Sequence, residues 1–438
     1  MKTHQENLEI RYLNPTELKL NPKNSRTHSK KQLHKIAQSI EKLGFNNPVL
    51  VDTENVIIAG HGRVLAARDL GLTEIPTICL SHMTQEQIRA YIIADNKLAE
   101  EAGWDNEILK IELDFLMNLE SEIGLDATIT GFDIPQLDLI LNPEVLDVVK
   151  DASKKDSDTE FLEKVIDIPK RVQKGDLWKL GEHLLYCGNS LEEISYKKLL
   201  QNELAQVVFT DPPYNVKIKG NVTKQKQHEE FELASGEMRK GEFIDFLKTA
   251  MNLQAKYSID GSIHYQCMDW RHVEEMLVAG RDIYSSLKNI CVWDKSTGGM
   301  GSLYRSQHEF IFVFKKGIKP HINNVELGVH GRYRTNVWKY KGLHASNPQA
   351  KTLIKLHPTV KPVPMIMDAL LDCSSPNGIV LDSFGGSGST LIAAERTKRR
   401  ARIIELEPKY CDVILYRWEH LTGKTAELVE LKEVYDVK

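Results

Sequence analysis

The chain has 438 residues, and its 57 Lys and Arg against 61 Asp and Glu give a formal net charge of −4. This length predicts two or three domains with ample core. The charge balance excludes a generally polybasic protein, so any surface that binds nucleic acid is expected to be local. The six cysteines form no Cys-x-x-Cys pair, which favours reduced thiols in a cytoplasmic protein. No run approaches the roughly 18 apolar residues of a membrane span, and the N-terminus does not resemble a signal peptide.

The first hundred residues predict a small α+β unit. Ser29 is expected to cap a helix that Gly44 ends, and two strands follow over 48–51 and 56–59. The turn Gly60-His61-Gly62-Arg63 then opens a second helix. A glycine-rich turn with His and Arg between a strand and a helix is a candidate phosphate site. An ordinary helix start is the equal alternative.

This segment resembles the N-terminal domain of ParB and sulfiredoxin-like proteins over roughly residues 8–100. The resemblance includes the stretch 21–26 (NPKNSR) and Gly71-Leu72 before Ile75-Pro76. It implies a domain over 1–115 whose turn Gly60–Arg63 binds nucleotide phosphates, in a family that varies between nucleotide switching, nuclease activity and DNA binding. Cys79 follows the helix and does not lie beside the turn, which argues against sulfiredoxin chemistry.

Residues 116–168 differ in composition from both flanking segments. Acidic side chains recur from 120 to 147, and 150–160 (KDASKKDSDTE) is polar and of low complexity. We expect an acidic helical connector followed by a flexible linker.

The tetrapeptide Asp211-Pro212-Pro213-Tyr214 ends the apolar run 205–210. A β-branched run that stops at two prolines predicts a buried strand leading into a rigid loop. The prolines fix φ and lack N–H groups, which leaves backbone carbonyls free to accept hydrogen bonds. A carboxylate, free carbonyls and an aromatic ring are suited to bind an exocyclic amino group on a flat heterocycle. An ordinary Asx-Pro turn is the alternative.

A second motif starts with the apolar strand 379–382 and continues through the glycine-rich turn 383–388 into a helix. Ser389 and Thr390 are its candidate caps. Such a turn lets a ligand approach the backbone and the free N–H groups of the helix. Glu405 ends the next strand, about 20 residues on, where an acid suits a ribose diol; Glu407 is the alternative ligand. No Gly-Lys-Ser/Thr follows the turn, so adenosine without a long phosphate tail fits best.

Together the two motifs resemble the amino-DNA methyltransferases that use S-adenosylmethionine, in the permuted motif order of their beta group. The resemblance covers roughly residues 170–425 and includes segments 174–188, 308–314, 357–362 and 417–423. It implies an α/β fold: a Rossmann-like methyltransferase domain with a mixed sheet over 169–438, preceded by the small α+β domain. It also implies S-adenosylmethionine as cofactor and no metal.

Site residues follow from the same resemblance. Asp211 and the Pro212 carbonyl would bind the target amino group, with Pro213 shaping the loop and Tyr214 stacking on the flipped base. Asn189 stands where the family usually has an aspartate, and it keeps one acceptor but loses the charge. The remaining residues implied at the cofactor are Asp382, Phe384, Gly385, Gly386, Gly388, Glu405, Thr359 and Lys361.

The resemblance also bears on the substrate, which it implies is double-stranded DNA. Aspartate at the first position of the tetrapeptide occurs in this family mainly with adenine-N6 and serine with cytosine-N4, so we expect adenine. The sequence has no Pro-Cys dipeptide for methylation at cytosine carbon-5. The alternatives are a cytosine-N4 methyltransferase, or a nucleotide-dependent ParB-like DNA-binding protein whose methyltransferase domain is inactive.

DNA contacts are expected from two basic stretches. Segment 315–361 lies where the beta group has its target recognition region, although a solvated basic loop is the alternative. A second basic stretch directly follows Tyr214. A nucleotide at the N-terminal domain, a homodimer, a restriction-modification setting and a prophage origin are left open. The residues expected at DNA are Lys217, Lys219, Arg332, Arg334, Lys339 and Lys341.

Overall fold

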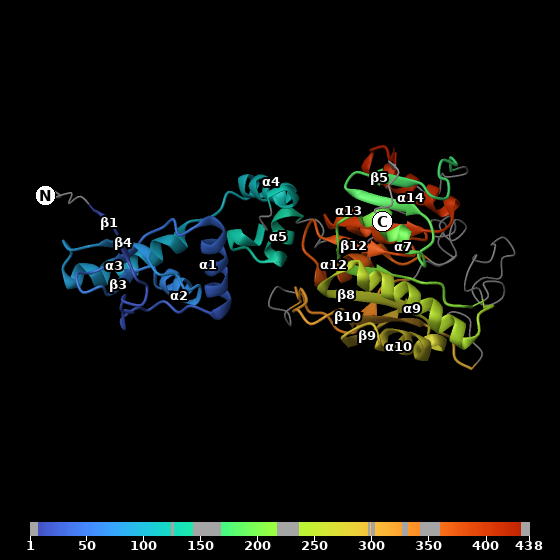
Figure 1. Cartoon of the computed structure of the whole chain (residues 1–438), viewed down its shortest axis with the longest axis horizontal. Helices are drawn as coiled ribbons and strands as arrows, with labels where there is room; N and C mark the ends of the chain where they lie inside the picture. Colours follow the sequence, from blue (N-terminus) through green and yellow to red (C-terminus); the bar gives the residue numbers. More distant parts are fainter. Residues whose placement is uncertain are drawn as a thin grey trace, which may run out of the picture. The chain divides into compact units, whose positions relative to one another are not determined.

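The protein divides into two compact units, Met1–Asp133 and Ile134–Lys438, and Figure 1 labels most of their elements. The boundary falls inside the predicted connector 116–168. No helix of the described part of the chain is long and apolar enough to cross a membrane. The computed structural model describes residues 8–123, 127–142, 168–216, 236–296, 298, 303–325, 332–341 and 360–430.

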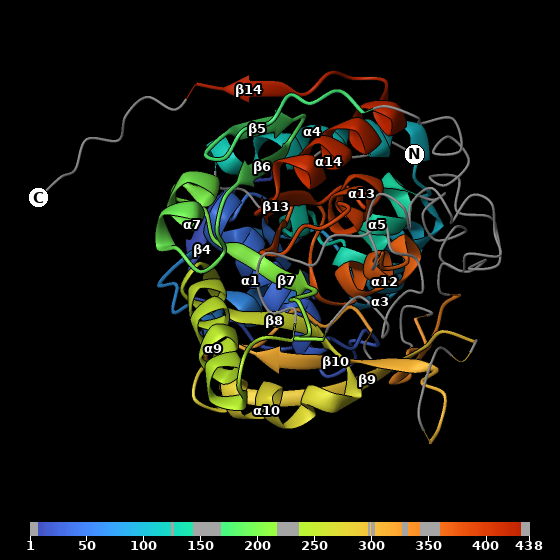
Figure 2. The same ribbon diagram turned by 90° about the vertical axis from the view of Figure 1, so that its right-hand side faces the viewer.

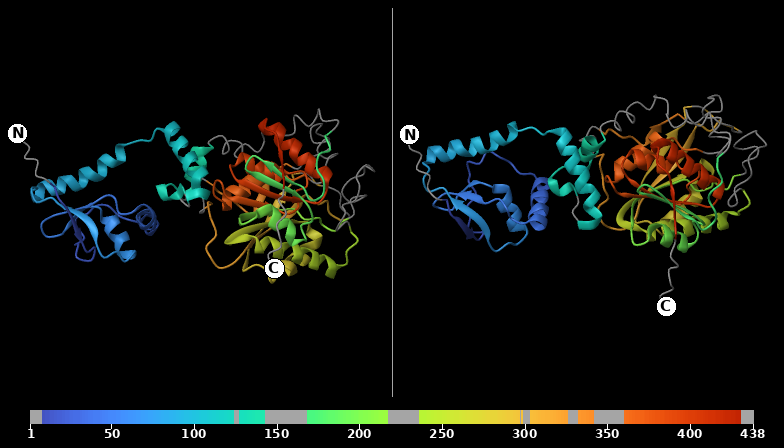
Figure 3. Two further views of the ribbon diagram at one scale, coloured as in Figure 1. Left: turned by 45° about the horizontal axis from the view of Figure 1, so that its top comes forward. Right: turned by 90° about the horizontal axis from the view of Figure 1, so that it is seen from above.

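The N-terminal unit is a four-stranded sheet with helices. Its elements are β1 (Ile10–Leu13), α1 (Lys30–Leu43), β2 (Val49–Val51), β3 (Ile57–Ala59), α2 (His61–Asp69), β4 (Ile75–Cys79), α3 (Gln85–Glu101), α4 (Asn106–Ile123) and a 3₁₀ turn (Ala127–Thr130). The strand order is β1-β4-β2-β3, and β2 and β4 are parallel. Figure 3 shows α3 as a long light-blue helix. The predicted domain limit after residue 115 lies within α4.

Local signals in this unit are confirmed. The Ser29 hydroxyl accepts a hydrogen bond from the Gln32 amide at 3.1 Å at the start of α1, and Gly44 ends that helix at φ 87°. Val49, Ile57 and Val64 belong to one buried cluster, so α2 packs its apolar side on the sheet. That packing positions the turn Gly60–Arg63.

The C-terminal unit is built on a ten-stranded mixed sheet in the order β11-β9-β10-β8-β7-β12-β13-β6-β5-β14. β6, β13, β12, β7 and β8 run parallel, and β10 lies antiparallel to β8 and β9. The strands are β5 (Leu177–Leu180), β6 (His183–Cys187), β7 (Ala205–Thr210), β8 (Ser258–Met268), β9 (Ser286–Asp294), β10 (His308–Lys315), β11 (Val337–Lys339), β12 (Ile379–Asp382), β13 (Arg400–Glu405) and β14 (Glu427–Val429). The helices are α5 (Ile134–Leu141), α7 (Glu193–Leu200), α9 (Lys240–Lys256), α10 (Val273–Arg281), α12 (Val363–Cys373), α13 (Ser389–Arg396) and α14 (Pro408–Thr422).

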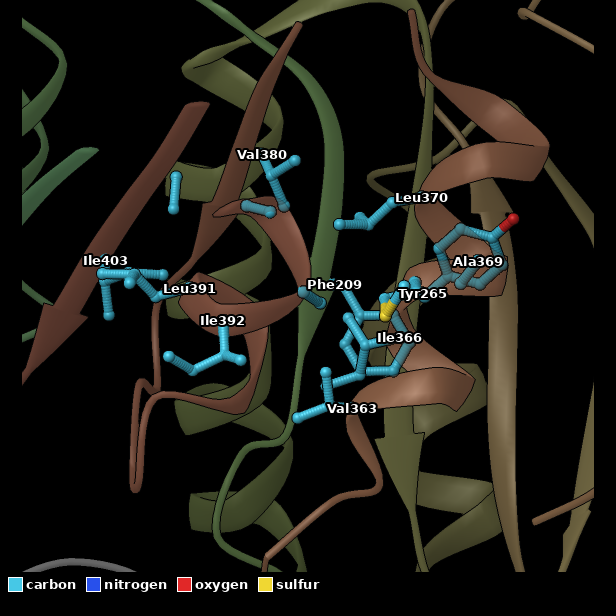
Figure 4. Close-up of a cluster of buried hydrophobic side chains, with 14 of the residues drawn as sticks. Phe209, Tyr265, Val363, Ile366, Ala369, Leu370, Val380, Leu391, Ile392 and Ile403 are labelled. Carbon is cyan, nitrogen blue, oxygen red and sulfur yellow. The ribbon is translucent and has the colours of Figure 1, made fainter. Parts of the chain in front are cut away.

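Helices cover both faces of this sheet. Successive strand residues point to opposite faces, so β10 gives Ile311 to the cluster of α12, α13 and α14, and Phe312 to the cluster of α9 and α10. Figure 2 shows α7 and α9 on one side of the strands and α12 and α13 on the other. In Figure 4, Phe209 of β7 and Tyr265 of β8 lie against Ile366 of α12. This α/β fold with a mixed sheet confirms the predicted fold class.

Helix α5, from the predicted connector, is attached to the C-terminal unit. Arg399 donates to both carboxylate oxygens of Asp138, at 2.5 and 3.0 Å. Both side chains are buried. Breaking a buried ion pair of this kind is strongly destabilising, so α5 is an integral part of the unit.

The fold brings the two predicted motifs to one edge of the sheet. β7 pairs in parallel with β12, so the loops after both strands lie at the same edge. α9 follows β7 on one face, whereas α13 follows β12 on the other. The chain thus leaves β7 and β12 toward opposite faces of the sheet. Open α/β sheets bind ligands at such a topological switch point.

Candidate active site

The predicted amine-binding loop lies at the carboxyl end of β7. The Tyr214 hydroxyl lies 2.6 Å from Asp211 Oδ1 and 3.1 Å from Glu309 Oε2 of β10. Pro212 is buried. The loop therefore holds a carboxylate and an aromatic ring together, as its sequence predicts.

Lys361 belongs to the same cluster. Its ammonium donates to Asp211 Oδ2 at 2.5 Å and to the Tyr214 hydroxyl at 3.2 Å, and lies 3.1 Å from Glu309 Oε2. Lys295 donates to the other oxygen of Glu309 at 2.5 Å. The structure therefore places Lys361 against the carboxylate of Asp211, while its contact with the cofactor stays a prediction.

Burial and the two lysines set the charge states here. Burial raises the pKa of Asp211, against the opposing effect of the Lys361 ammonium. For Glu309 burial acts in the same direction, but Lys361 and Lys295 overcome it and lower its pKa to about 2. Asp211 and Glu309 raise the pKa of Lys361 in spite of its burial. The cluster thus holds two carboxylates and two ammonium groups whose charges balance.

The glycine-rich loop after β12 is tied directly to β7. Asp382 Oδ1 accepts from the Thr210 hydroxyl at 2.9 Å and from the Phe384 amide at 3.0 Å, and Oδ2 accepts from the Thr390 hydroxyl at 2.6 Å. The predicted cap is wrong, because Gly388, at φ 83°, is the N-cap of α13. Thr390 instead fixes the carboxylate that shapes the loop.

Glu405 faces this loop from the end of β13. Its oxygens accept from the amides of Gly386 at 2.7 Å and Glu407 at 2.9 Å. Burial raises the pKa of Glu405 to about 7, and it does the same for Asp382. Glu407 follows the strand as the N-cap of α14, so Glu405 is the acid that lies against the glycines.

The loop packs closely on the structure behind it. A Cβ on Gly385 would lie 2.4 Å from the Ile403 side chain, and one on Gly388 would lie 2.9 Å from Ile414. Phe384 packs 5.9 Å from the ring of Phe246. At positions 385 and 388, therefore, only glycine fits without displacing a neighbour.

These residues fit S-adenosylmethionine. Each Glu405 oxygen keeps a lone pair for a ribose hydroxyl, and the amides at the start of α13 are free of intrahelical partners. Within the described residues, the buried Ser389 hydroxyl has no hydrogen-bond partner. An acid, open amides and an unpaired hydroxyl are the groups that a polar adenosyl ligand requires.

Asn189 follows β6, which pairs in parallel with β13, so it lies at the same edge of the sheet as Glu405. Its Oδ1 accepts from the Leu191 amide at 3.0 Å, and its Nδ2 donates to Glu192 at 3.2 Å. The side chain thus forms an Asx turn ahead of α7, a role that asparagine and aspartate share.

The six residues predicted at DNA fall into three groups. Lys339 and Lys341 are exposed, as phosphate contacts require. Arg332 and Arg334 instead form ion pairs of 2.6 to 3.0 Å with Asp368 and Asp372 of α12, and are only 11% and 19% exposed. Their prediction as DNA contacts is untested, but the structure gives both a partner within the chain. Lys217, Lys219 and, at the cofactor, Thr359 lie outside the described residues.

The predicted phosphate turn of the N-terminal unit has its own contacts. Gly60 has φ 103° at the start of α2, and His61 is buried and accepts from the Asn21 amide at 3.3 Å. Burial, and secondarily His28, lowers the pKa of His61, so the ring is neutral. Arg63 donates to the Asn47 carbonyl at 2.5 Å. Gly62 packs against Ile36 and His28, which leaves its place in a phosphate site a prediction.

Three side chains of the site were not predicted from the sequence: Glu309, Lys295 and Thr210. Glu309 is an acid inside the strongly apolar run 308–314, which is a usable signal because unpaired charges are rarely buried. Lys295 carries no such signal, since it follows β9 and reaches Glu309 only through the antiparallel pairing of β9 with β10.

Comparison with known proteins agrees with this geometry. Residues 205–416 match a family model described as DNA methylase, and residues 1–96 match the ParB N-terminal domain. The chain is 46% identical over 82 residues, 19% of its length, to the ParB-like nuclease domain-containing protein YnaK of Escherichia coli (strain K12), of which it covers 94%. It is 24% identical over 246 residues to the type II methyltransferase M1.MboII of Moraxella bovis, covering 52% of this chain and 92% of that protein.

Among solved structures, the cytosine-N4-specific PvuII DNA methyltransferase is similar at 18% identity and a TM-score of 0.41. The match covers 55% of this chain and 89% of that one. The chain thus carries, over residues 205–416, a DNA methylase domain of the kind that modifies N6 or N4 amino groups with S-adenosylmethionine as methyl donor, and a ParB N-terminal domain precedes it.

Proposed function

We propose that the protein is a site-specific methyltransferase that modifies the exocyclic N6 of a flipped adenine in double-stranded DNA. The observation that carries this proposal is the cluster at the end of β7, where Asp211 and Tyr214 lie beside the loop after β12. The Thr210–Asp382 hydrogen bond joins the two loops, so amine and methyl donor would meet at one edge of the sheet.

The amine-binding groups act on a poor nucleophile. The lone pair of an exocyclic aryl amine is delocalised into the ring. Asp211 and the Pro212 carbonyl accept the amine hydrogens and favour a tetrahedral, nucleophilic nitrogen. The cofactor supplies an activated methyl group, so holding the nitrogen in line with it provides much of the remaining acceleration.

The target base has to leave the duplex before it reaches this pocket. Flipping costs a few kcal/mol of lost stacking and pairing. Tyr214, partly buried beside Asp211, offers a ring on which the base can stack and recover part of that cost. Exposed Lys339 and Lys341 are proposed to contact DNA phosphates, which position the protein without specifying sequence.

Adenine is preferred because the loop begins with aspartate, and cytosine-N4 is the second candidate. The test is tritiated-methyl transfer from S-adenosylmethionine to unmethylated double-stranded DNA, with the product nucleosides separated by chromatography. We expect label in N6-methyladenine. Label in N4-methylcytosine would keep the site and change the base, and no label with bound cofactor would refute the proposed activity.

For the N-terminal unit we propose binding of nucleotide phosphates at the turn before α2. The positive φ of Gly60 and the position of Arg63 in the first turn of the helix support it. Arg63→Ala is expected to abolish nucleotide binding by the full chain, measured by calorimetry with nucleoside triphosphates. Lys110→Ala, which removes an exposed lysine on α4 of the same unit, is the control. Unchanged binding in Arg63→Ala would place the site elsewhere.

A further inference from the structure

Lys361 occupies an unusual position for a lysine. It directly precedes Pro362, the N-cap of α12, and its side chain is only 7% exposed. Its ammonium lies 2.5 Å from Asp211 Oδ2, at the carboxylate proposed to receive the target amine. An ammonium is an N–H donor of nearly the same size as the amino group that is expected to bind there.

The Asp211 carboxylate is already engaged by groups of the chain. Oδ2 accepts from Lys361, and Oδ1 lies 2.6 Å from the Tyr214 hydroxyl. A charge-assisted hydrogen bond is about twice as strong as a neutral one. An arriving amine therefore competes with the ammonium for Asp211, and a carboxylate bonded to an ammonium is a weaker acceptor for the amine.

Glu309 gives the ammonium an alternative partner. Its Oε2 lies 3.1 Å from Lys361, so a small side-chain rotation transfers the ammonium from one carboxylate to the other without leaving it unpaired. Lys295 holds the second Glu309 oxygen and keeps this carboxylate in place. The low pKa of Glu309 keeps it ionised throughout the neutral range.

We propose that Lys361 is a placeholder for the target amine: its ammonium occupies Asp211 in the empty enzyme and moves onto Glu309 when the base enters. Lys361 and Glu309 are then positioning residues, and the inference rests on the proposed function. The exchange keeps Asp211 ionised in a buried pocket until a base arrives. It also favours bases with an exocyclic amine, since other bases have no amino donor to replace the ammonium.

Single-turnover methyl transfer by the full chain tests this exchange in Glu309→Gln and Lys361→Met. In Glu309→Gln the ammonium loses its second carboxylate, so the rate is expected to fall at least about tenfold with unchanged affinity for S-adenosylmethionine. Glu274→Gln is the control, because its ion pair with Lys240 is exposed. In the Lys361→Met background Glu309→Gln is expected to cost little more, because no ammonium remains to be moved.

The pH profile separates this role from a structural one. Asp211 faces Lys361 and Glu309, Tyr214 of its own loop, Cys267 of β8 and Asp382 of β12. Without the ammonium its pKa rises further, so the midpoint of the rate profile in Lys361→Met is expected to move up by about one unit or more. Lys361→Arg, which keeps the charge, is expected to restore the midpoint.

Two results would overturn the placeholder while leaving the proposed function intact. One is wild-type rates and pH midpoints in both variants. The other is an equal cost of Glu309→Gln with and without Lys361. A wild-type protein that transfers no methyl group refutes the proposed function itself, and the placeholder with it, because there is then no amine for which the ammonium exchanges.

Discussion

The buried carboxylates at the two ends of the site have different kinds of partner. At the amine end, Asp211 and Glu309 are both paired with lysines. At the cofactor end, the hydrogen bonds of Asp382 and Glu405 come from hydroxyls and backbone amides. Burial raises the pKa values of Asp382 and Glu405 to about 7, whereas the lysines lower that of Glu309 to about 2. At Asp211 burial outweighs the effect of Lys361, so its pKa is raised as well.

This difference matches the charge of the ligand proposed for each end. S-adenosylmethionine carries a positive sulfonium, and carboxylates without lysine partners leave negative charge in its pocket. The target amine is neutral, and it enters a pocket whose charges are already balanced. Buried charges are costly unless they are compensated. At the cofactor end the ligand would bring a positive charge, and among the described residues the chain places no lysine on Asp382 or Glu405. At the amine end the ligand would be neutral, and lysines of the chain balance the two carboxylates.

The largest expected effect comes from removing the charge at the amine end. Asp211→Asn keeps the shape of the side chain but loses the anion that accepts the amine hydrogens. We expect methyl transfer to fall by about 10³-fold or more, measured in single turnover, with cofactor affinity unchanged. A rate close to wild type would remove Asp211 from its proposed role, and a loss of cofactor binding would indicate that the two ends are not separate.

A change at the cofactor end is expected to be smaller and to depend on pH. With a pKa of about 7, Glu405 gains its charge as the pH rises from 6 to 8, and the ionised form is the better partner for ribose hydroxyls and a cation. The dissociation constant of S-adenosylmethionine should therefore fall about tenfold over this range. Glu405→Gln should bind about 10- to 100-fold more weakly at pH 8 and lose much of this pH dependence, as calorimetry can measure.

Glu405 and Glu309 should change the free energy of unfolding in opposite directions as the pH rises. Glu405 has a raised pKa, so the folded state holds its proton longer, and stability falls as the pH rises from about 4.5 to 7. Glu309 has a lowered pKa, so its contribution is present above about 4.5 and is lost as the pH falls toward 2. Chemical denaturation of Glu405→Gln and Glu309→Gln across this range compares the two directly.

Much of the fold and the two loops could be predicted from the sequence because their signals are local. The apolar run before Asp211-Pro212-Pro213-Tyr214 forms β7, and the glycine-rich turn joins β12 to α13, as expected. Both patterns depend on residues adjacent in the chain. Their proximity follows from the parallel pairing of β7 with β12, which only the resemblance to a known family implied.

The charge pairing could not be predicted, because it depends on contacts between distant residues. Lys361 reaches Asp211 across 150 positions of sequence. Arg332 and Arg334 lie in a basic stretch, and composition does not distinguish a side chain that finds an acid on α12 from one that faces solvent. A count of positive charges therefore overestimates what is available to DNA.

The smallest expected effects, on DNA affinity, separate these two kinds of basic residue. Lys339→Ala and Lys341→Ala remove exposed charges, so each should weaken DNA binding a few-fold and lower the salt dependence of log K by about one unit. Arg334→Met removes the partner of two buried aspartates, so it should cost about 3 kcal/mol of unfolding free energy and leave the salt dependence of the folded protein unchanged. A salt slope lowered by Arg334→Met at full stability would show that this guanidinium leaves Asp368 and Asp372 to bind a phosphate. In that case Arg334 would exchange its aspartate partners for a ligand when DNA binds, as is proposed for Lys361 and Asp211.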